Sequence, residues 1–322
     1  MARKQKPQAP NHDEVSKVTS RRAKAGVTKA RCLLPRISVV IVSRNEGCNL
    51  RRTVQQLQAT SPVSSEIIVV DDGSTDGSTD FVSSFETAVR LVRTNCVGVT
   101  KARNYGATQS HGEVIVFADA HIDAPSGWWS PIQELLSVPS VGGVAPAISL
   151  MGSPTTRGYG LRLTGPDLSI EWLTKQDKLP YQVPIIPGCF LAMRRNTFAA
   201  TGGFDDGMDT WGMSDIELSL RLWLLGYELW VVPQVIVPHL FRTKHPYEVK
   251  WSAVLHNKLR VAFVHFNAER TSRVVKALCH HNDFPTALAM TATSNFSQRR
   301  REMALQRRYD DNWFFQRFGP DL

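Results

Sequence analysis

The chain has 322 residues, of which 42% are hydrophobic, so it is long enough to bury a substantial core in one large domain. Its formal net charge is +9, and residues 1–36 carry most of the excess, with ten Lys and Arg against Asp13 and Glu14. This segment lacks the apolar stretch of a secretory signal, and its Pro, Ser, Lys and Arg content predicts a disordered tail. No run of eighteen apolar residues occurs anywhere, so no membrane-spanning helix is expected.

The basic tail has two interpretations. The simpler one is a solvated arm, and the alternative is electrostatic attachment to an anionic surface, such as the inner face of a membrane. Nucleic acid is not an expected partner. The chain has five cysteines, an odd number with no C-x-x-C pair, which indicates a reduced, cytoplasmic setting.

From residue 37 onward, short β-branched runs alternate with segments of helical length. The pattern predicts strands and crossover helices, in chain order a strand at 37–43, a helix at 49–60, strands at 66–72 and 89–94, a helix at 100–110 and a strand at 113–119. The strands are apolar nearly throughout, which indicates a mostly parallel central sheet flanked by helices, in an α/β fold. In such sheets ligands bind beyond the carboxyl ends of the strands.

The second predicted strand ends in "DDGSTDGS", residues 71–78. Gly73 permits a tight turn here, and acidic residues in turns are common. Alternatively, Asp71 or Asp72 could accept hydrogen bonds from the base or the ribose of a nucleotide. The segment alone does not decide between these interpretations.

The fourth predicted strand runs into "DAH", which places Asp119 and His121 two residues apart. Alternate residues of an extended chain lie on the same side, and carboxylate and imidazole groups are both metal ligands. The spacing alone is as compatible with a metal site as with the simpler alternative, an Asp that caps a loop beside a solvated His.

A third candidate ligand, His239, follows the apolar run of "VVPQVIVPHLFR", residues 231–242. Pro233 and Pro238 indicate an edge or terminating strand. One carboxylate and two imidazoles suit Mn²⁺ or a related ion such as Mg²⁺, with positions left for phosphate oxygens and water. Arg242 could then bind a phosphate, or could be a surface arginine at the exit of the strand.

The segment "GGFDDGMDTWGMSDIELSLRLWLLGYELW", residues 202–230, predicts a loop followed by a helix. Ser214 and Glu217 have the S-x-x-E spacing of a capping box, which predicts a helix at about 215–225 that ends at Gly226. The loop before this helix combines glycines, acids and Trp211. Such a loop is predicted to move over a substrate.

In chain order, "SVVIVSRNE", "EIIVVDDGSTDGS", "ARNYGA", "VIVFADAHID", "GGFDDGMDTWG", "SDIELSLRLWLLGYEL" and "VPHLFR" resemble family 2 glycosyltransferases of the GT-A fold. The resemblance covers residues 37–247. The D-x-H element, "GMDTWG" and "HLFR" are similar to the catalytic domain of polypeptide N-acetylgalactosaminyltransferases. It implies a GT-A fold, a UDP-sugar donor and a Mn²⁺ ion that bridges the donor diphosphate.

The resemblance also assigns roles to residues of this chain. Asp119 and His121 match the metal-binding pair, and His239 matches the distal ligand. The donor contacts that it implies are Asp71, Asp72, Arg103, Trp211 and Arg242.

The resemblance leaves the stereochemistry open. Polypeptide transferases carry Gly-Gly-Glu-Asn after the Trp, where this chain has Gly212-Met213-Ser214-Asp215. Many family 2 enzymes have Glu-Asp here, with the Asp as the general base of an inverting reaction, and Asp215 aligns with that base. Inversion is therefore slightly favoured, whereas the metal set resembles a retaining subgroup.

After residue 247 the chain departs from this resemblance. Residues 251–278 have apolar residues at helical spacing, which predicts a helix packed on the catalytic domain, and packing or surface roles are expected for its histidines and those just after it. The Arg-rich and aromatic segment 298–319 could be a docked helix, a partner contact or a membrane-surface helix. The predicted domains are a basic tail at 1–36, a glycosyltransferase domain at 37–247 and a helical extension at 248–322.

These features predict a metal-dependent hexosyl- or N-acetylhexosaminyltransferase that acts on the hydroxyl of a protein, a lipid-linked saccharide or a small molecule. Two alternatives belong to other classes. A catalytically silent nucleotide-sugar-binding protein would fit the missing acid before Asp215. A nucleotidyltransferase would also use a parallel sheet and a metal, but "SRNEG" lacks the glycine-rich triphosphate loop that such an enzyme needs after its first strand.

Overall fold

The computed structural model of the protein describes residues 37–84, 89–320 and 322. The predicted basic tail, residues 1–36, lies outside the described residues. Within the described part, every helix is too short or too polar to cross a lipid bilayer.

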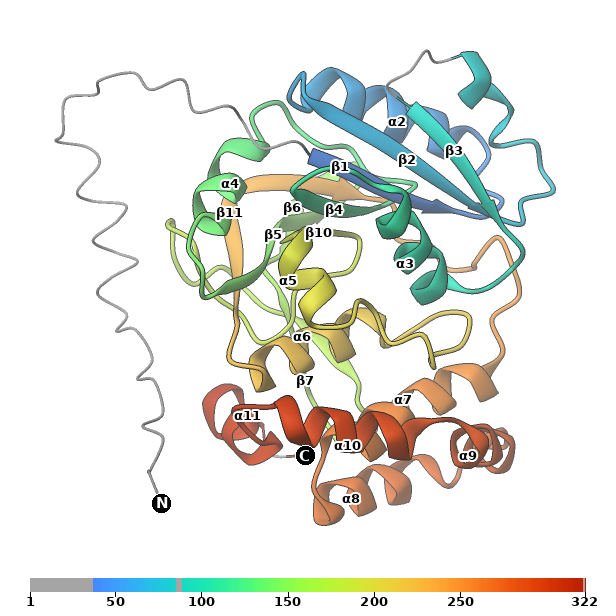
Figure 1. Ribbon diagram of the computed structural model, residues 1–322, viewed down its shortest axis with the longest axis vertical. Coiled ribbons are helices and arrows are strands. Elements are labelled where there is room, and N and C mark those ends of the chain that lie inside the picture. The colour runs from blue at the N-terminus through green and yellow to red at the C-terminus, as the bar shows by residue number, and fades with distance from the viewer. Residues whose placement is uncertain (1–36, 85–88, 321) are drawn as a thin grey trace, which may run out of the picture. The chain divides into compact units, whose positions relative to one another are not determined.

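The elements occur in an order typical of an α/β protein, followed by a run of helices (Figure 1). The strands are β1 (Ile37–Ser43), β2 (Ser65–Asp72), β3 (Val89–Thr94), β4 (Val114–Asp119), β5 (Val141–Leu150), β6 (Ser153–Gly158), β7 (Leu161–Leu163), β8 (Ile170–Trp172), β9 (Tyr181–Gln182), β10 (Phe190–Arg194) and β11 (Glu228–His239). The helices are α2 (Cys48–Thr60), the 3₁₀ helix η2 (Asp80–Ser84), α3 (Val99–Gln109), α4 (Trp129–Leu136), α5 (Arg195–Ala200), α6 (Ser214–Leu224), α7 (Trp251–His265), α8 (Ala268–Leu278), α9 (Phe284–Thr293), α10 (Phe296–Gln306) and α11 (Asp311–Phe318).

The central sheet has the strand order β3-β2-β1-β4-β10-β5-β11-β9, and β6 pairs with β5. Strands β3, β2, β1 and β4 pair with one another in parallel, and β11 is parallel to β5. Strand β10 is antiparallel to both β4 and β5. The predicted α/β class and mostly parallel sheet are confirmed.

The sheet is covered on both faces, as its near-continuous apolar strands predicted. Val39, Val40 and Ile41 follow one another in β1 and are all fully buried, so both faces of this strand are shielded from water. Helix α3 approaches the sheet through Gly106, where a Cβ would lie 2.4 Å from a methyl group of Val40. Only a glycine permits this close packing.

Strand β11 carries one end of the candidate site. It begins at Glu228, three residues before the quoted segment, and ends at His239, the residue at which the sequence placed the end of the strand. Its pairing with β5 shifts register between Val232 and Ile236, and this irregular stretch contains Pro233. On its other side, β11 pairs with β9 only through Trp230 and Val231. The rest of β11 is therefore an edge strand on that side, as its prolines indicated.

Helix α6 forms at the predicted place, but the predicted capping box is wrong. The residue before the helix is Met213, with φ 67°, and no side chain caps the amino terminus. Glu217 instead turns inward, where its Oε1 accepts hydrogen bonds from Arg221 Nε at 2.8 Å and His265 Nε2 at 2.9 Å. A buried guanidinium binds a carboxylate more strongly than one exposed backbone N–H does, so Glu217 is drawn away from the helix end.

The carboxyl-terminal segment packs against the rest of the described chain. The single helix predicted at 251–278 is two helices, because α7 ends at His265 and Phe266 is extended. Asn267 then caps α8 by accepting from the N–H of Arg270 at 2.8 Å. In α11, Phe314 and Phe315 are buried, which fits the docked-helix interpretation of residues 298–319. Residues 240–250 contain no helix or strand, and the domain boundary at 247 stays a prediction.

Candidate active site

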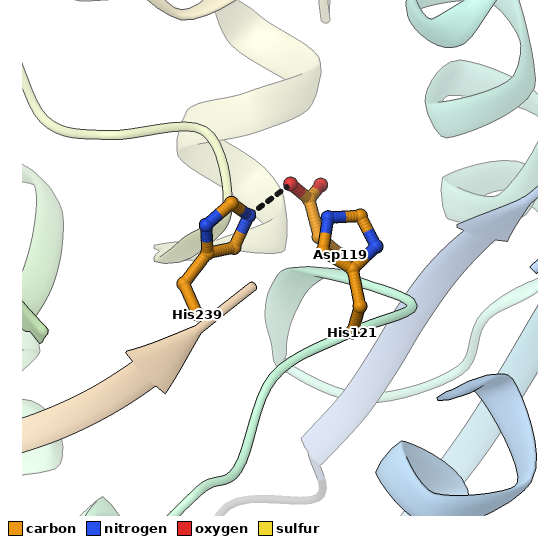
Figure 2. A group of neighbouring side chains, drawn as sticks. All are labelled: Asp119, His121 and His239. Atoms are coloured by element: carbon orange, nitrogen blue, oxygen red, sulfur yellow. Dashed lines mark hydrogen bonds and ion pairs between the residues drawn. The ribbon is translucent and has the colours of Figure 1, made fainter. Parts of the chain in front are cut away.

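Asp119, His121 and His239 meet where β4 and β11 end (Figure 2). After β4 the chain forms an isolated antiparallel bridge between Ile122 and His239. The N–H of Leu240 donates to the carbonyl of His121 at 3.1 Å. This backbone pairing brings the end of β11, some 120 residues away in sequence, to the D-x-H element.

The three side chains form a group that could hold a metal ion. One ligand atom from each residue lies within 4.8 Å of the others, and His239 Nε2 is 3.2 Å from Asp119 Oδ2. One carboxylate oxygen and two imidazole nitrogens fit Mn²⁺ better than Mg²⁺, which prefers oxygen ligands alone. The donor set predicted from sequence is therefore brought together, and its metal-binding role stays a prediction.

Arg103, a predicted donor contact, holds Asp119 in the candidate metal site. Its Nη2 lies 3.1 Å from Asp119 Oδ1 and also donates to the carbonyl of Gly188 at 2.8 Å. Burial alone would raise the pKa of Asp119. The hydrogen bond from His239 and the charges of Arg103 and the histidines hold that pKa below its ordinary range. Asp119 is therefore ionised at neutral pH, as a metal ligand must be.

Glu46 is part of the site, although the sequence reasoning assigned it no role. Its Oε2 lies 3.2 Å from His121 Nδ1, and Arg242 donates to its Oε1 at 3.0 Å. Burial opposes ionisation of Glu46, but the hydrogen bonds from His121 and Arg242 lower its pKa. Since Nδ1 of His121 faces Glu46, Nε2 is the nitrogen left for a ligand. The only sequence signal was the position of Glu46 in "SVVIVSRNE", directly after β1.

Asp215 is linked to the candidate metal site through Gly188. The N–H of Gly188 donates to Asp215 Oδ2 at 3.1 Å, and its carbonyl accepts from Arg103. A Cβ at Gly188 would lie 3.1 Å from the Cβ of Asp215, so a side chain here would crowd Asp215. Burial raises the pKa of Asp215 above its ordinary value. A carboxylate with a raised pKa is a better proton acceptor than an exposed one.

The two acids of "DDGSTDGS" are bound to nearby parts of the chain. Asp72 Oδ1 accepts from the N–H of Val97 at 2.8 Å, and its Oδ2 accepts from the N–H of Gly98 at 3.0 Å. Asp71 Oδ1 accepts from the N–H of Ser74 at 2.9 Å. These contacts give both acids a structural role, and their role as donor contacts stays a prediction.

Trp211 stands on the loop before α6, and its side chain is exposed. Its ring centroid is 4.5 Å from that of His245. Burial and the positive charges of Arg242 and His121 lower the pKa of His245. The role of Trp211 as a donor contact stays a prediction.

Comparison with known proteins agrees with this geometry. The family model for glycosyl transferase family 2 matches residues 38–202, which is more than half of the chain. The chain belongs to glycosyl transferase family 2. A second model, described as the N-terminal domain of galactosyltransferase, matches residues 173–246 of this family 2 member, and this range includes Trp211 and His239.

Curated relatives carry names of one kind of transferase. The chain is 31% identical over 239 residues to the probable N-acetylgalactosaminyltransferase 9 of Caenorhabditis elegans, an alignment that covers 67% of this chain and 41% of the relative. It is 33% identical over 238 residues to the polypeptide N-acetylgalactosaminyltransferase 4 of Mus musculus, with coverage of 66% and 41%. The chain therefore spans less than half the length of these relatives.

A solved structure supports the fold of this family 2 glycosyltransferase. The crystal structure of GalNAc-T7 with UDP, GalNAc and Mn²⁺ superposes with a TM-score of 0.73 at 23% identity, and covers 88% of this chain and 56% of that chain. The predicted GT-A fold and the relationship to polypeptide N-acetylgalactosaminyltransferases are confirmed.

Proposed function

We propose that this family 2 glycosyltransferase moves a hexose or an N-acetylhexosamine from a UDP-sugar to an acceptor hydroxyl, with a bound divalent metal ion. The observation that carries the proposal is the Asp119, His121 and His239 group at the carboxyl ends of β4 and β11, with Asp119 held in its ionised form. Two relatives named as N-acetylgalactosaminyltransferases support the donor class.

In this proposal Asp119, His121 and His239 hold Mn²⁺. When bound, the ion neutralises charge that develops on the leaving diphosphate. Arg103 keeps Asp119 ionised and fixed in place, and Glu46 orients the ring of His121. Asp71, Asp72, Trp211 and Arg242 are retained as proposed donor contacts.

Asp215 is the proposed general base of an inverting reaction. Its carboxylate removes the proton of the acceptor hydroxyl while that oxygen forms a bond to the anomeric carbon and the bond from this carbon to the diphosphate breaks. The raised pKa of Asp215 suits this role. Retention is the alternative, and the anomeric configuration of the product, measured by NMR, distinguishes the two.

The proposed acceptor is a protein, a lipid-linked saccharide or a small molecule, the three classes that the sequence indicated. A cytoplasmic enzyme with peripheral contact at the inner face of a membrane is the proposed setting. It rests on the cysteine content and the basic residues 1–36.

The first test measures UDP release from a panel of UDP-sugars with and without Mn²⁺. We expect release that depends on Mn²⁺, that is lost in His121→Ala and Asp215→Asn, and that persists in His280→Ala. His280 is an exposed histidine after α8 and serves as the matched control.

Two results would overturn the proposal. Release of pyrophosphate from a nucleoside triphosphate would identify a nucleotidyltransferase. Metal-dependent UDP binding with no transfer to any class of acceptor would identify a nucleotide-sugar-binding protein.

A further inference from the structure

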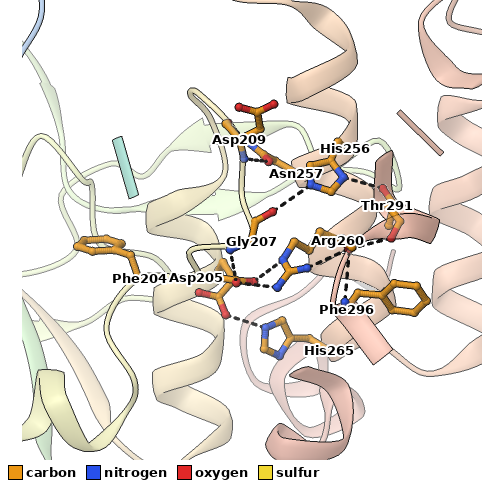
Figure 3. Close-up of polar contacts among 12 residues, drawn as sticks. Phe204, Asp205, Gly207, Asp209, His256, Asn257, Arg260, His265, Thr291 and Phe296 are labelled. Carbon is orange, nitrogen blue, oxygen red and sulfur yellow. Dashed lines mark hydrogen bonds and ion pairs between the residues drawn. The ribbon is translucent and has the colours of Figure 1, made fainter. Parts of the chain in front are cut away.

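Helix α7 of the extension lies against the loop at 205–213 that precedes α6 (Figure 3). Arg260 donates from Nε to Asp205 Oδ2 at 2.7 Å and from Nη2 to Asp205 Oδ1 at 2.8 Å, and both side chains are fully buried. His256 Nε2 lies 3.0 Å from the carbonyl of Gly207. A Cβ at Gly207 would overlap the guanidinium of Arg260, so helix and loop are in direct contact.

Asn257 continues these contacts toward the candidate active site. Its Oδ1 accepts from the N–H of Asp209 at 2.8 Å, and its Nδ2 donates to the carbonyl of the same residue at 2.8 Å. Nδ2 also lies 3.1 Å from the carbonyls of Trp211 and Gly212. The side chain is fully buried, and its whole amide group is used to hold loop backbone.

The loop needs such support because its backbone is strained. Thr210 has φ 41° and Met213 has φ 67°, values in the left-handed region that L residues rarely adopt. Each such residue costs about 1–3 kcal/mol and persists only where its surroundings hold it. On the other side of the loop, the carbonyl of Thr210 accepts from the N–H of Val99 at 3.0 Å. The loop is therefore held between α7 and the start of α3.

Two proposed functional side chains depend on this loop. Trp211 stands within it, beside His245, and Asp215 follows it in the first turn of α6. A shift of the backbone at 209–213 would therefore move the proposed donor contact and the proposed base together.

We propose that Asn257 is a positioning residue for sugar transfer, which fixes the Trp211 loop from the helical extension. The inference rests on the proposed function, because it takes Trp211 as a donor contact and Asp215 as the base. The helical extension then contributes to the transferase site by positioning this loop, in addition to packing on the domain.

The kinetic test compares Asn257→Ala with Asn267→Ala. Asn267 lies in the same extension and caps α8, and it forms hydrogen bonds with Arg270, Asp311 and Asn312. Misplacement of catalytic groups by about 1 Å costs about 100-fold in rate, so we expect kcat/KM to fall about 10- to 100-fold in Asn257→Ala. Asn267→Ala should stay within about two-fold of the native chain, because loss of a cap costs only about 1 kcal/mol of stability. Equal losses in the two variants would contradict the proposal.

A double-mutant cycle with Trp211→Ala separates positioning from general destabilisation. If Asn257 acts through the loop, its replacement by Ala should cost less activity in the Trp211→Ala background than in the native chain, and the loss that remains there is the effect on Asp215. Purely additive effects would show that Asn257 does not act through Trp211. Asn257→Ser, which is smaller but polar, replaces the Ala variant if the latter does not fold.

A measurement that needs no turnover keeps this inference distinct from the proposed function. Hydrogen exchange of the full chain should show faster exchange in the peptide that spans 205–213 for Asn257→Ala, because the N–H of Asp209 loses its acceptor. Asn267→Ala should leave this peptide protected. If no donor is turned over but exchange changes as expected, the transferase proposal fails and the support of the loop by Asn257 stands. Unchanged exchange overturns the inference whatever the activity.

Discussion

Two groups of acidic, basic and histidine side chains lie within this glycosyltransferase, and they differ in how fully their atoms are bound. The candidate metal site contains Asp119, His121 and His239, with Arg103 behind it. The inner cluster contains Glu217, Arg221 and His265, which join α6 to α7. Both groups contain a carboxylate, a guanidinium and an imidazole, so residue type alone does not separate them.

The inner cluster is closed to solvent. The side chains of Glu217, Arg221 and His265 are each at most 1% exposed. Glu217 accepts from Arg221 through both oxygens, and Arg221 also donates to the carbonyls of Thr201 and Gly203. A group so fully bound has no position left for a ligand.

The candidate metal site is open by comparison. The side chain of Asp119 is 30% exposed. The buried Nδ1 of His239 has no hydrogen-bond partner among the described residues. The difference teaches that a group of charges can take a ligand when it keeps access to solvent, whereas a closed group contributes to stability.

The largest expected effect is on activity at the candidate metal site. Asp119→Asn keeps the size of the side chain but removes its charge, so we expect kcat/KM for transfer to fall at least about 1,000-fold. Because the charge of Asp119 also balances that of the nearly buried Arg103, the free energy of unfolding should fall as well, but by less than in Glu217→Gln, as measured by urea denaturation. If Asp119→Asn is unfolded under the conditions of the assay, so that unfolding explains its loss of activity, the comparison is contradicted.

The inner cluster should show the reverse. Glu217→Gln leaves the buried guanidinium of Arg221 without its counter-charge and should lower the free energy of unfolding by about 3–5 kcal/mol in urea. Glu269 and Arg273 form an exposed pair with the same i, i+4 spacing, so Glu269→Gln is the matched control. It should change stability by at most about 0.5 kcal/mol. Equal effects of the two substitutions would show that burial of the inner pair is not decisive.

A smaller effect is expected at Glu46, which contacts His121 but is not itself a proposed ligand. Glu46→Gln should weaken Mn²⁺ binding about 10- to 100-fold, because the orientation of the imidazole is less well fixed. Isothermal titration with Mn²⁺ measures this, and Glu134→Gln on α4 is a control at an exposed glutamate. Unchanged affinity would remove Glu46 from the site.

The most gradual effect is the pH dependence of stability. Burial opposes ionisation of Glu217, but the charge and hydrogen bonds of Arg221 and His265 lower its pKa below the ordinary value of 4.5. Its stabilisation is therefore complete above about pH 4.5 and is lost progressively as the pH falls below that value. The urea midpoint of the native chain should fall over this range more steeply than that of Glu217→Gln. Parallel curves would contradict the assignment.

The sequence predicted much of the sheet because its signals are local. Strands β1 and β3 have the predicted bounds, and β2 and β4 differ by one residue. An apolar run buried on both faces is visible in a few consecutive letters. The D-x-H element is equally local, since alternation along one strand end places Asp119 and His121 together.

The predictions that failed concern side chains that could bind either a neighbour in the sequence or a residue far along the chain. Ser214 and Glu217 have the spacing of a capping box, but Glu217 binds Arg221 and His265 instead. The partners of Glu46 and Asn257 also lie far along the chain, so no pattern near either residue could reveal its role.

The sequence by itself determined the α/β class, the positions of the strand ends and the residue types of a metal site. The tertiary structure decided that β11 ends beside β4, that Glu46 faces His121 and that α7 holds the Trp211 loop. The physical reason is that periodicity and turn chemistry act over a few residues. Which buried polar groups become partners depends instead on how distant segments close around them, because each must find a hydrogen bond within the folded chain.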